Sequence, residues 1–158
     1  MYQNKNQQDQ AIAAAERAIA LNPNNANVYM ALAELMGLAG RPEEGIAMAK
    51  TAMRLNPHYP PWYLLRLGMT YHQAWRNDEA IATLKRFLAY YPNSLGAHIG
   101  LTCSYSDAGQ EGEARAEAAE VMRLSPNFTT ETWRQNQFWR DTAEMERHLS
   151  NLRKAGLK

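Results

Sequence analysis

The sequence predicts an all-α fold, a right-handed α-solenoid of antiparallel helix pairs that ends in capping helices. The main observation is a set of four prolines, Pro23, Pro57, Pro92 and Pro126, which stand 34, 35 and 34 residues apart. Between them, apolar residues recur at the spacing of one helix face, and a short turn, usually with Gly, divides each interval in two. A fixed period of about 20 to 50 residues is typical of stacked supersecondary units, which present surfaces and rarely carry chemistry of their own.

The chain begins with one expected helix, from about Gln8 to Leu21. We assign residues 1–25 to a truncated first repeat, because most of its first helix is lacking. The apolar flank of the remaining helix is therefore expected to lack its usual partner; this flank is Ile12, Ala15 and Ile19. We interpret the chain as a piece of a longer protein, and the alternative is that residues 1–7 simply fray.

The next expected unit covers residues 26–59 and shows the repeat most clearly. Its first helix carries one apolar stripe, formed by Tyr29, Leu32, Ala33 and Met36. Gly40 is expected to end this helix in the left-handed conformation, and Pro42 to begin the second. The second helix carries a stripe of small residues, namely Gly45, Ala49 and Ala52. Small side chains let two helix backbones approach closely, so this stripe is expected to cross the first helix.

Two further units, residues 60–94 and 95–126, repeat this arrangement with two irregularities. Gly109 makes the central turn of the last unit, but Trp75 stands at the equivalent place in the unit before it. We expect either that this turn differs or that Trp75 covers an apolar gap. The longer interval of 35 residues indicates one inserted residue near residues 58–61, which is expected to bulge the turn there.

The tail, residues 127–158, leaves the repeat pattern and predicts a short helix through about Gln137, followed by a second helix. Thr129 or Thr130 can cap the first, which carries Trp133 and is followed by Phe138 and Trp139. The second is expected to begin at a capping box, Asp141 with Glu144, and to end at Gly156. We interpret the tail as a cap over the last repeat, since arrays need terminal caps. The alternative is a helix that is offered to another subunit.

Composition excludes several classes of function. The 17 Lys and Arg nearly balance the 16 Asp and Glu, so neither nucleic acid nor an anionic membrane is an expected partner. No apolar run is long enough to span a bilayer, and the first ten residues lack the apolar core of a signal peptide. Cys103 is the single cysteine, so no internal disulfide can form, and a reducing, cytoplasmic location fits best.

No constellation in the sequence predicts catalysis, a cofactor or a metal. The histidines, His58, His72, His98 and His148, include no pair at the i, i+4 spacing that places two ligands on one helix face. We interpret Cys103 as a small hydrophobe that lines a helix face. Nucleotide-binding glycine loops and nucleophile elbows are absent from the sequence. The chain is therefore not expected to be an enzyme.

The pattern from Leu67-Gly68-x2-Tyr71 through Ala80 to Pro92 resembles the tetratricopeptide repeat (TPR) family. The resemblance covers about residues 9–126. It implies a concave groove lined by the first helix of each pair, whose candidate residues here are Asn27, Met30, Glu34, Leu65, Arg66, Met69, His72, Ile99, Cys103 and Ser106. Because only Arg66 among them is basic, a clamp for a peptide's carboxylate is disfavoured. We expect a dry, apolar groove with His72 and Arg66 at its rim, and ordinary packing between repeats is the alternative for these residues.

The tail carries a second resemblance, in the stretch from Leu124 to Leu157, which closes with Leu-Arg-Lys-Ala-Gly-Leu. It looks like the C-terminal end of bacterial signalling proteins in which a TPR region follows a class III adenylate/guanylate cyclase domain or a winged-helix regulator domain. The sequence therefore predicts a protein–protein interaction module that binds an apolar or amphipathic peptide or helix, as the regulatory or scaffolding segment of such a protein. The alternatives are a homodimerisation module that associates through the N-terminal helix, and a free-standing TPR adaptor.

Overall fold

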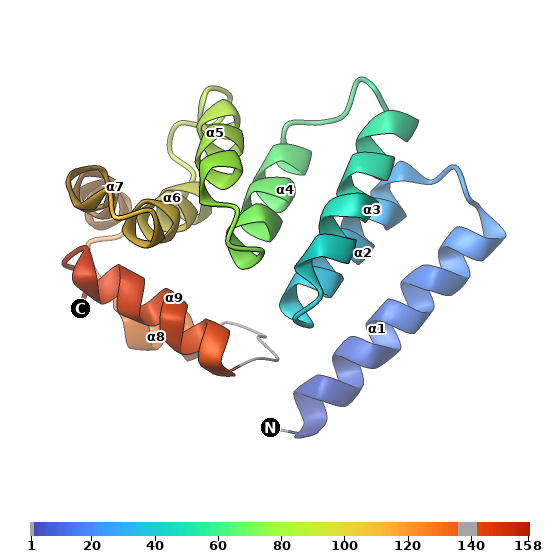
Figure 1. Ribbon diagram of the computed structural model, residues 1–158, viewed down its shortest axis with the longest axis horizontal. Helices are drawn as coiled ribbons and strands as arrows, with labels where there is room; N and C mark the ends of the chain where they lie inside the picture. The colour runs from blue at the N-terminus through green and yellow to red at the C-terminus, as the bar shows by residue number, and fades with distance from the viewer. Residues whose placement is uncertain (1, 136–141) are drawn as a thin grey trace.

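The computed structural model of the chain describes residues 2–135 and 142–158, with side chains from residue 6 onward. The elements in these ranges are all helices (Figure 1). In chain order they are α1 (Tyr2–Leu21), α2 (Ala26–Leu38), α3 (Pro42–Leu55), α4 (Trp62–Gln73), α5 (Asn77–Leu88), α6 (Leu95–Asp107), α7 (Glu111–Leu124), α8 (Thr130–Gln135) and α9 (Thr142–Lys154).

The helices stack in antiparallel pairs, α2 with α3, α4 with α5 and α6 with α7, and each pair packs on the next (Figure 1). We call these the first, middle and last pairs. The first helices of the pairs, α2, α4 and α6, lie side by side and form what we call the inner face of the array. The predicted all-α solenoid is confirmed for the described residues.

The central turns of the three pairs share one geometry, in which a residue with positive φ ends the first helix. This residue is Gly40 (φ 79°), Trp75 (φ 61°) or Gly109 (φ 73°). The next residue in each turn donates its backbone N–H to a helix carbonyl at 2.9 Å, with the same register in all three pairs. This bond is the six-residue closure of a Schellman motif. The expectation that the turn at Trp75 differs is therefore wrong.

Trp75 also covers no apolar gap. Its side chain is 59% exposed, and the guanidinium carbon of Arg147 on α9 lies 3.7 Å from the centre of its ring. Tryptophan tolerates the left-handed conformation poorly, because its Cβ crowds the following carbonyl. The aromatic stack on Arg147 is the compensating contact at this position.

This arrangement predicts the order of stability of two Trp75 variants. Trp75→Ala and Trp75→Gly both lose the stack on Arg147, but only Ala keeps the backbone strain, so the Gly variant is expected to be more stable by about 1 kcal/mol. Gly40→Ala is the matched control, since Gly40 has φ 79° and no atom within 4 Å of an added Cβ. Gly40→Ala should lower the free energy of unfolding, measured in urea, by about the same amount as the difference between the two Trp75 variants. Equal stability of the two Trp75 variants would contradict the assigned backbone conformation.

The close crossing of α2 and α3 occurs where the small-residue stripe predicted it. A Cβ added at Gly45 would lie 2.6 Å from the backbone oxygen of Ala33. Ala49 and Ala52, one and two turns farther along α3, are fully buried. The glycine therefore sets the distance between the two helix backbones of the first pair.

Gly45→Ala is expected to destabilise the protein by about 1–3 kcal/mol, because a backbone oxygen cannot move aside as a side chain can. Gly112→Ala in α7 is the control, since Gly112 lies in the first turn of that helix with nothing within 4 Å of an added Cβ. That change is expected to be neutral or stabilising by up to about 1 kcal/mol. Chemical unfolding of both variants gives the comparison, and similar effects at both positions would refute the close crossing.

A second glycine contact joins the middle and last pairs through Leu84 of α5, which is fully buried. A Cβ added at Gly68 of α4 would lie 2.7 Å from Cγ of Leu84, and one added at Gly100 of α6 would lie 3.0 Å from its Cδ1. Real Cβ atoms essentially never make the closer of these approaches and rarely make the other, so the two glycines provide the space that Leu84 fills.

The connection between α3 and α4 is longer than its counterparts. Helix α4 begins five residues after Pro57, whereas α2 and α6 begin three residues after Pro23 and Pro92. The expected insertion near residues 58–61 thus lengthens the turn, which extends beyond the ends of its helices in Figure 1.

Helix α1 corrects two expectations about the N-terminal segment. It begins at Tyr2 and not near Gln8. Its apolar flank does have a partner, because Ile12 is buried against Leu32 and Met36 of α2, with Ala15 and Ile19 packed around them. The next pair thus covers Ile12, while Ala15 and Ile19 remain partly exposed.

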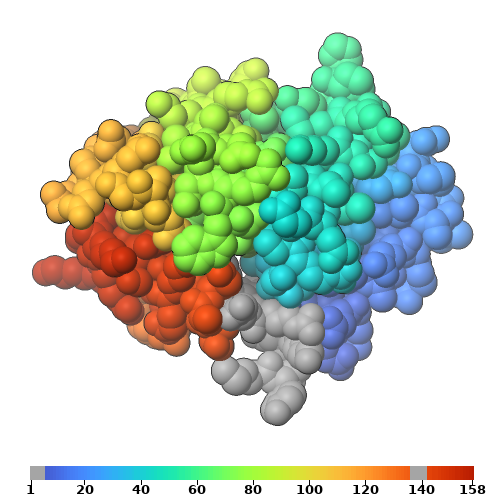
Figure 2. Space-filling model, viewed as in Figure 1, coloured from blue at the N-terminus to red at the C-terminus, as the bar shows by residue number. Residues whose placement is uncertain are grey.

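The C-terminal helices fold back across the array. Leu149 and Leu152 of α9 are fully buried, and α9 packs on α6, on the inner face. In the space-filling view, α9 (red) lies directly against the middle of the chain (Figure 2). The backbone N–H of Thr130, at the start of α8, donates to the carbonyl of Lys158 at 2.6 Å, which ties the two tail helices together. The predicted capping residue Asp141, and Phe138 and Trp139, lie outside the described residues.

Candidate functional site

A pocket of about 270 Å³ opens on the inner face, where α2, α4, α6 and α8 meet. Its apolar part comes from Leu38, Leu65, Met69, Ile99 and Trp133, and the remaining lining residues are Glu34, Arg66, Thr70, Gln73 and Gly96. First helices supply every lining residue except Trp133, because their shared face is the side on which the array curves.

An ion pair between Glu34 and Arg66 borders the pocket and connects α2 with α4. Burial raises the pKa of the Glu34 carboxyl, and the charge of Arg66 acts in the opposite direction. The side chains remain partly exposed, at 37% for Glu34 and 43% for Arg66. The pair therefore gives an otherwise apolar pocket one polar edge that a partner could reach.

The structure brings half of the predicted groove residues together. Glu34, Leu65, Arg66, Met69 and Ile99 line the pocket. Asn27 lies apart from it, exposed, where its side-chain oxygen accepts a hydrogen bond from the Tyr63 hydroxyl at 2.6 Å. Of the sequence-predicted set, the remaining residues are Met30, His72, Cys103 and Ser106.

These remaining residues are not groove surface. Met30, His72 and Cys103 are fully buried, and Ser106 donates a hydrogen bond to the backbone oxygen of Asn151 on α9 at 3.3 Å. The placement of His72 at the rim is therefore wrong. The physical reason is that α9 lies over this end of the inner face, which a fold-back of the tail decides and the repeat pattern does not.

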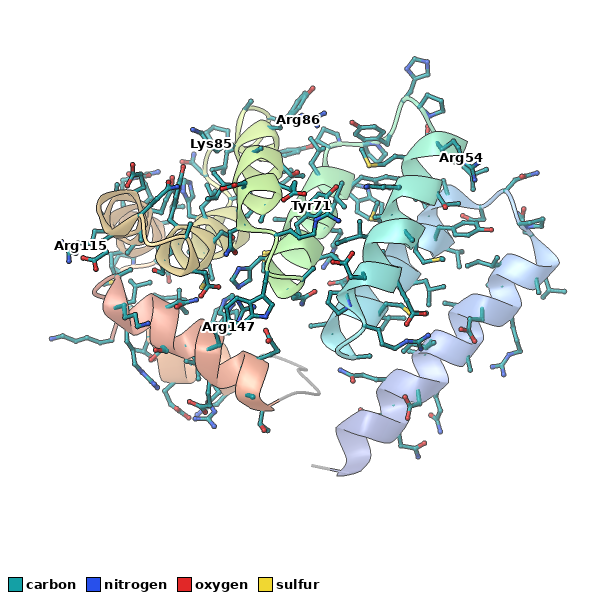
Figure 3. All side chains as sticks on the ribbon, in the orientation of Figure 1. Arg54, Tyr71, Lys85, Arg86, Arg115 and Arg147 are labelled. Carbon is teal, nitrogen blue, oxygen red and sulfur yellow. The ribbon has the colours of Figure 1, made fainter. Side chains whose placement is uncertain are left out.

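Arg147 holds α9 in this position. From α9 it projects toward α4 (Figure 3), where it donates to the backbone oxygen of His72 at 3.2 Å and stacks on Trp75. It also pairs with Asp107 of α6 at 2.5 Å and with Glu144 of its own helix at 2.7 Å. The sequence placed Trp133 only in a cap over the last repeat and did not single out Arg147, so the roles of both were missed. The available signals were a Trp on the six-residue α8 and an Arg on α9.

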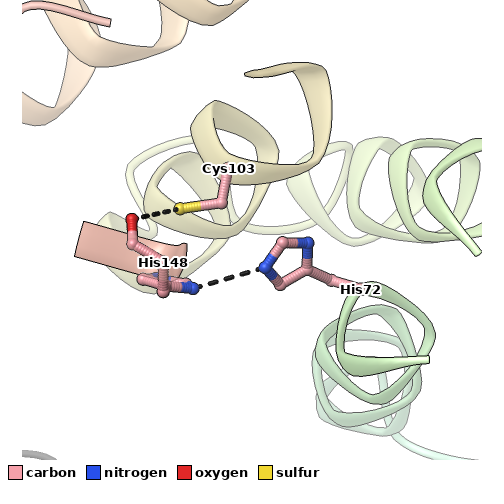
Figure 4. Close-up of side chains that lie close together, drawn as sticks. All are labelled: His72, Cys103 and His148. Carbon is pink, nitrogen blue, oxygen red and sulfur yellow. Dashed lines mark hydrogen bonds between the residues drawn. The ribbon is translucent and has the colours of Figure 1, made fainter. Parts of the chain in front are cut away.

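Beneath Arg147, three side chains with metal-binding atoms meet in the interior. His72 of α4, Cys103 of α6 and His148 of α9 point toward one another (Figure 4), and their ligand atoms lie within 4.8 Å of each other. Nδ1 of His148 is 3.3 Å from Nε2 of His72, and the Cys103 thiol points at the His148 carbonyl at 3.7 Å. The expectation of no metal ligands considered spacing along one helix only, whereas this group is assembled from three helices.

Burial keeps all three groups uncharged. Desolvation lowers the pKa of His148 to about 3 and that of His72 well below its usual value, and it raises the pKa of the Cys103 thiol well above its usual value. Arg147 lowers both histidine pKa values further. On one side, the Trp133 ring stacks on His148 with centroids 4.5 Å apart. The cluster is thus an apolar-walled group of neutral imidazoles and a thiol.

No helix among the described residues is both long and apolar enough to cross a membrane. None of the curated proteins compared with the chain matches it in sequence.

Solved structures show the same fold at low sequence identity. The crystal structure of MamA matches with a TM-score of 0.68 and 19% identity over 97% of this chain and 89% of that one. PilW, described as a widely conserved type IV pilus biogenesis factor, matches with a TM-score of 0.73 and 24% identity over 98% of this chain and 68% of that one. YrrB, described as a TPR protein with an unusual peptide-binding site, matches with a TM-score of 0.63 and 19% identity over 95% and 77%.

The sequence itself matches one family twice. Residues 5–66 and residues 63–94 each match tetratricopeptide repeats, and together the two matches span more than half of the chain. The positive-φ turns, the glycine crossings and the stacked pairs described above are the structural counterpart of these matches. The chain belongs to the tetratricopeptide repeat family.

Proposed function

We propose that this protein is a protein–protein interaction module that binds a peptide segment in the inner-face pocket. The observation that supports this most directly is the combination of an apolar pocket with a polar edge, lined by α2, α4, α6 and α8. Repeat arrays characteristically use such curved faces as binding surfaces. The described binding site of YrrB, a protein of similar fold, agrees with this type of function.

The dimensions of the pocket indicate the chemistry of the partner. A volume of about 270 Å³ is slightly below the range of pockets that hold small-molecule ligands. It suits one large apolar side chain better than the whole face of a helix. Methionine packs adaptably, so Met69 can adjust to differently shaped apolar groups. The Glu34–Arg66 pair can bind polar groups of the flanking peptide. The proposed ligand is therefore a peptide with one apolar or aromatic anchor next to polar residues.

Selection from a displayed random-peptide library on the immobilised full chain tests this function. We expect the enriched peptides to share one large apolar residue, and their affinity is then measured by fluorescence polarisation. Met69→Glu is expected to weaken binding at least tenfold, because it places a carboxylate in the apolar part of the pocket. Met122→Glu is the matched control, since Met122 is 40% exposed on α7, away from the pocket.

Arg66→Glu provides a second variant at an exposed position and is expected to alter the selected polar residues beside the anchor. Circular dichroism establishes that each variant is folded. Peptides that bind Met69→Glu and Arg66→Glu as well as the unchanged protein would place the binding site elsewhere. Failure of the selection to enrich any anchor residue would also contradict the proposal.

The link to nucleotide-cyclase signalling proteins rests on the likeness of residues 124–157, and we propose it on that basis alone. Its test is the genomic reading frame around this sequence. A cyclase or winged-helix domain in the same frame would support the link, and a frame that encodes the repeats alone would favour a free-standing adaptor.

A further inference from the structure

We propose that His72, Cys103 and His148 form a binding site for a d¹⁰ metal cation, Zn²⁺ or Cu⁺, that clamps α9 onto the inner face of the array. The three ligand atoms lie within 4.8 Å of one another, and all three residues are buried. They come from α4, α6 and α9, so a bound cation would join the middle pair, the last pair and the tail.

The distance between the two imidazoles fits a shared cation. In a tetrahedral site with Zn–N bonds of about 2.0–2.1 Å, two nitrogen ligands stand about 3.3 Å apart. Nε2 of His72 and Nδ1 of His148 stand 3.3 Å apart. Their rings are tilted by 71° to each other, and both nitrogens point into the space between α4 and α9 (Figure 4). The pair thus has the separation that coordination requires.

The third ligand needs a small adjustment. In the same geometry, a sulfur at about 2.3 Å from zinc stands about 3.5 Å from each nitrogen. Cys103 Sγ is within 4.8 Å of the imidazole nitrogens, so a change in its side-chain torsion or a shift of about 1 Å completes the set. The thiol must lose its proton, which passes to solvent as the metal–sulfur bond forms. The bound cation supplies the positive charge that makes a buried thiolate favourable.

Neighbouring groups support the required protonation states. The cation needs the lone pair of Nε2 on His72, which places the ring proton on Nδ1. Asp107 Oδ2 lies 3.7 Å from that Nδ1, beyond hydrogen-bond distance, and Nδ1 has no hydrogen-bond partner among the described residues. A small movement of either side chain would bring the carboxylate behind the metal-binding histidine, which is a frequent arrangement. Asn151 and Arg147 in turn hold Asp107, at 2.7 and 2.5 Å.

The ligand set selects the class of metal. Thiolate and imidazole ligands suit Zn²⁺ and Cu⁺, while Mg²⁺ and Ca²⁺ require oxygen ligands. Three protein ligands match a three-coordinate Cu⁺ site, or a Zn²⁺ site with a fourth position taken by another donor. The two cations share this chemistry, and separate titrations distinguish them.

The experiment uses the full chain after removal of metals with a chelator. Zn²⁺, and Cu⁺ under anaerobic conditions, are titrated separately, with Co²⁺ as the optical probe for the divalent arm. We expect one equivalent per chain for the preferred cation, and for Co²⁺ an absorption band from charge transfer out of the Cys103 thiolate. Cys103→Ser and His148→Asn are expected to lower the affinity at least tenfold. His58→Asn, which changes an exposed histidine outside the cluster, should bind as the unchanged protein does.

Protection from proteolysis tests the clamp itself. The metal-bound protein is expected to resist cleavage within α9 longer than the metal-free protein, and Cys103→Ser should remove this difference. No stoichiometric binding of either cation, or equal affinity in Cys103→Ser and the unchanged protein, would overturn the proposal. The absence of a thiolate band in the unmutated Co²⁺ complex would overturn Cys103 as a ligand even if a variant fails to fold.

Discussion

Leu84→Ala is expected to lower the free energy of unfolding by about 3–5 kcal/mol, one of the largest effects of any single substitution here. Leu84 is fully buried between Gly68 and Gly100, where no side chain of either glycine can fill the cavity that the change leaves. The cavity would lie where the middle and last pairs meet, so the surrounding helices can close it only by shifting against each other. Urea unfolding followed by circular dichroism measures the loss.

A double-mutant cycle with Gly68→Ala gives this prediction a sharper form. In the unchanged protein, the new Cβ would lie 2.7 Å from Cγ of Leu84, so Gly68→Ala should destabilise by about 1–3 kcal/mol. In the Leu84→Ala background that atom is gone, and the next atom of residue 84, its backbone nitrogen, lies 3.4 Å away. The same substitution should then be neutral or stabilising, because it fills part of the cavity. Additive effects in the cycle would contradict the packing of Leu84 against Gly68.

The metal-free protein is expected to lose stability steeply as the pH falls below about 6.5. His148 has its pKa lowered to about 3, and His72 has its pKa lowered well below the usual value, in both cases chiefly through burial. The unfolded chain binds protons on these residues from about pH 6.5 downward, while the folded protein does not. Each histidine can therefore contribute up to about 1.4 kcal/mol of destabilisation per pH unit, and the contribution of His148 ends near pH 3.

The charged groups around His72 and His148 do not reverse this loss of stability at low pH. Arg147 of α9 faces both rings and opposes their protonation, and Asp107 of α6 faces His72 but is already paired with Arg147. Free energies of unfolding in urea at pH 7, 6 and 5 test the prediction. His148→Asn should reduce the slope, because one of the two buried imidazoles is removed. An unchanged slope in this variant would show that other groups control the acid sensitivity.

Several elements could be predicted because local chemistry determines them. Gly40 and Gly109 end helices at positions that need positive φ, and Gly45 stands where two helices cross. These features recur with the proline period, so each unit supports the assignment of the others. Trp75 shows the limit of such reasoning, since its turn matches the others although its residue type disfavours the conformation. Arg147, which lies far along the chain, stacks on the Trp75 ring.

The pocket was predictable only in part. The register of α2, α4 and α6 places Glu34, Arg66, Met69 and Ile99 on one face, as the resemblance to TPR arrays implied. Trp133 joins the same pocket from α8. No periodicity relates it to the first helices, because the tail does not continue the repeat.

The sequence by itself determined the helix pairs and their turns, because these follow from contacts within about one repeat length. The face proposed for a partner came from the resemblance to TPR arrays. Only the tertiary structure decided that α9 folds back over that face. This fold-back buries His72 and Cys103 and brings His148 to them from 76 and 45 residues away along the chain. Such contacts arise from burial of Leu149 and Leu152 and from the ion pairs of Arg147, which have no repeated counterpart. Non-repeated, long-range packing leaves no period in a sequence, and here it forms both the end of the pocket and the cluster of metal-binding side chains.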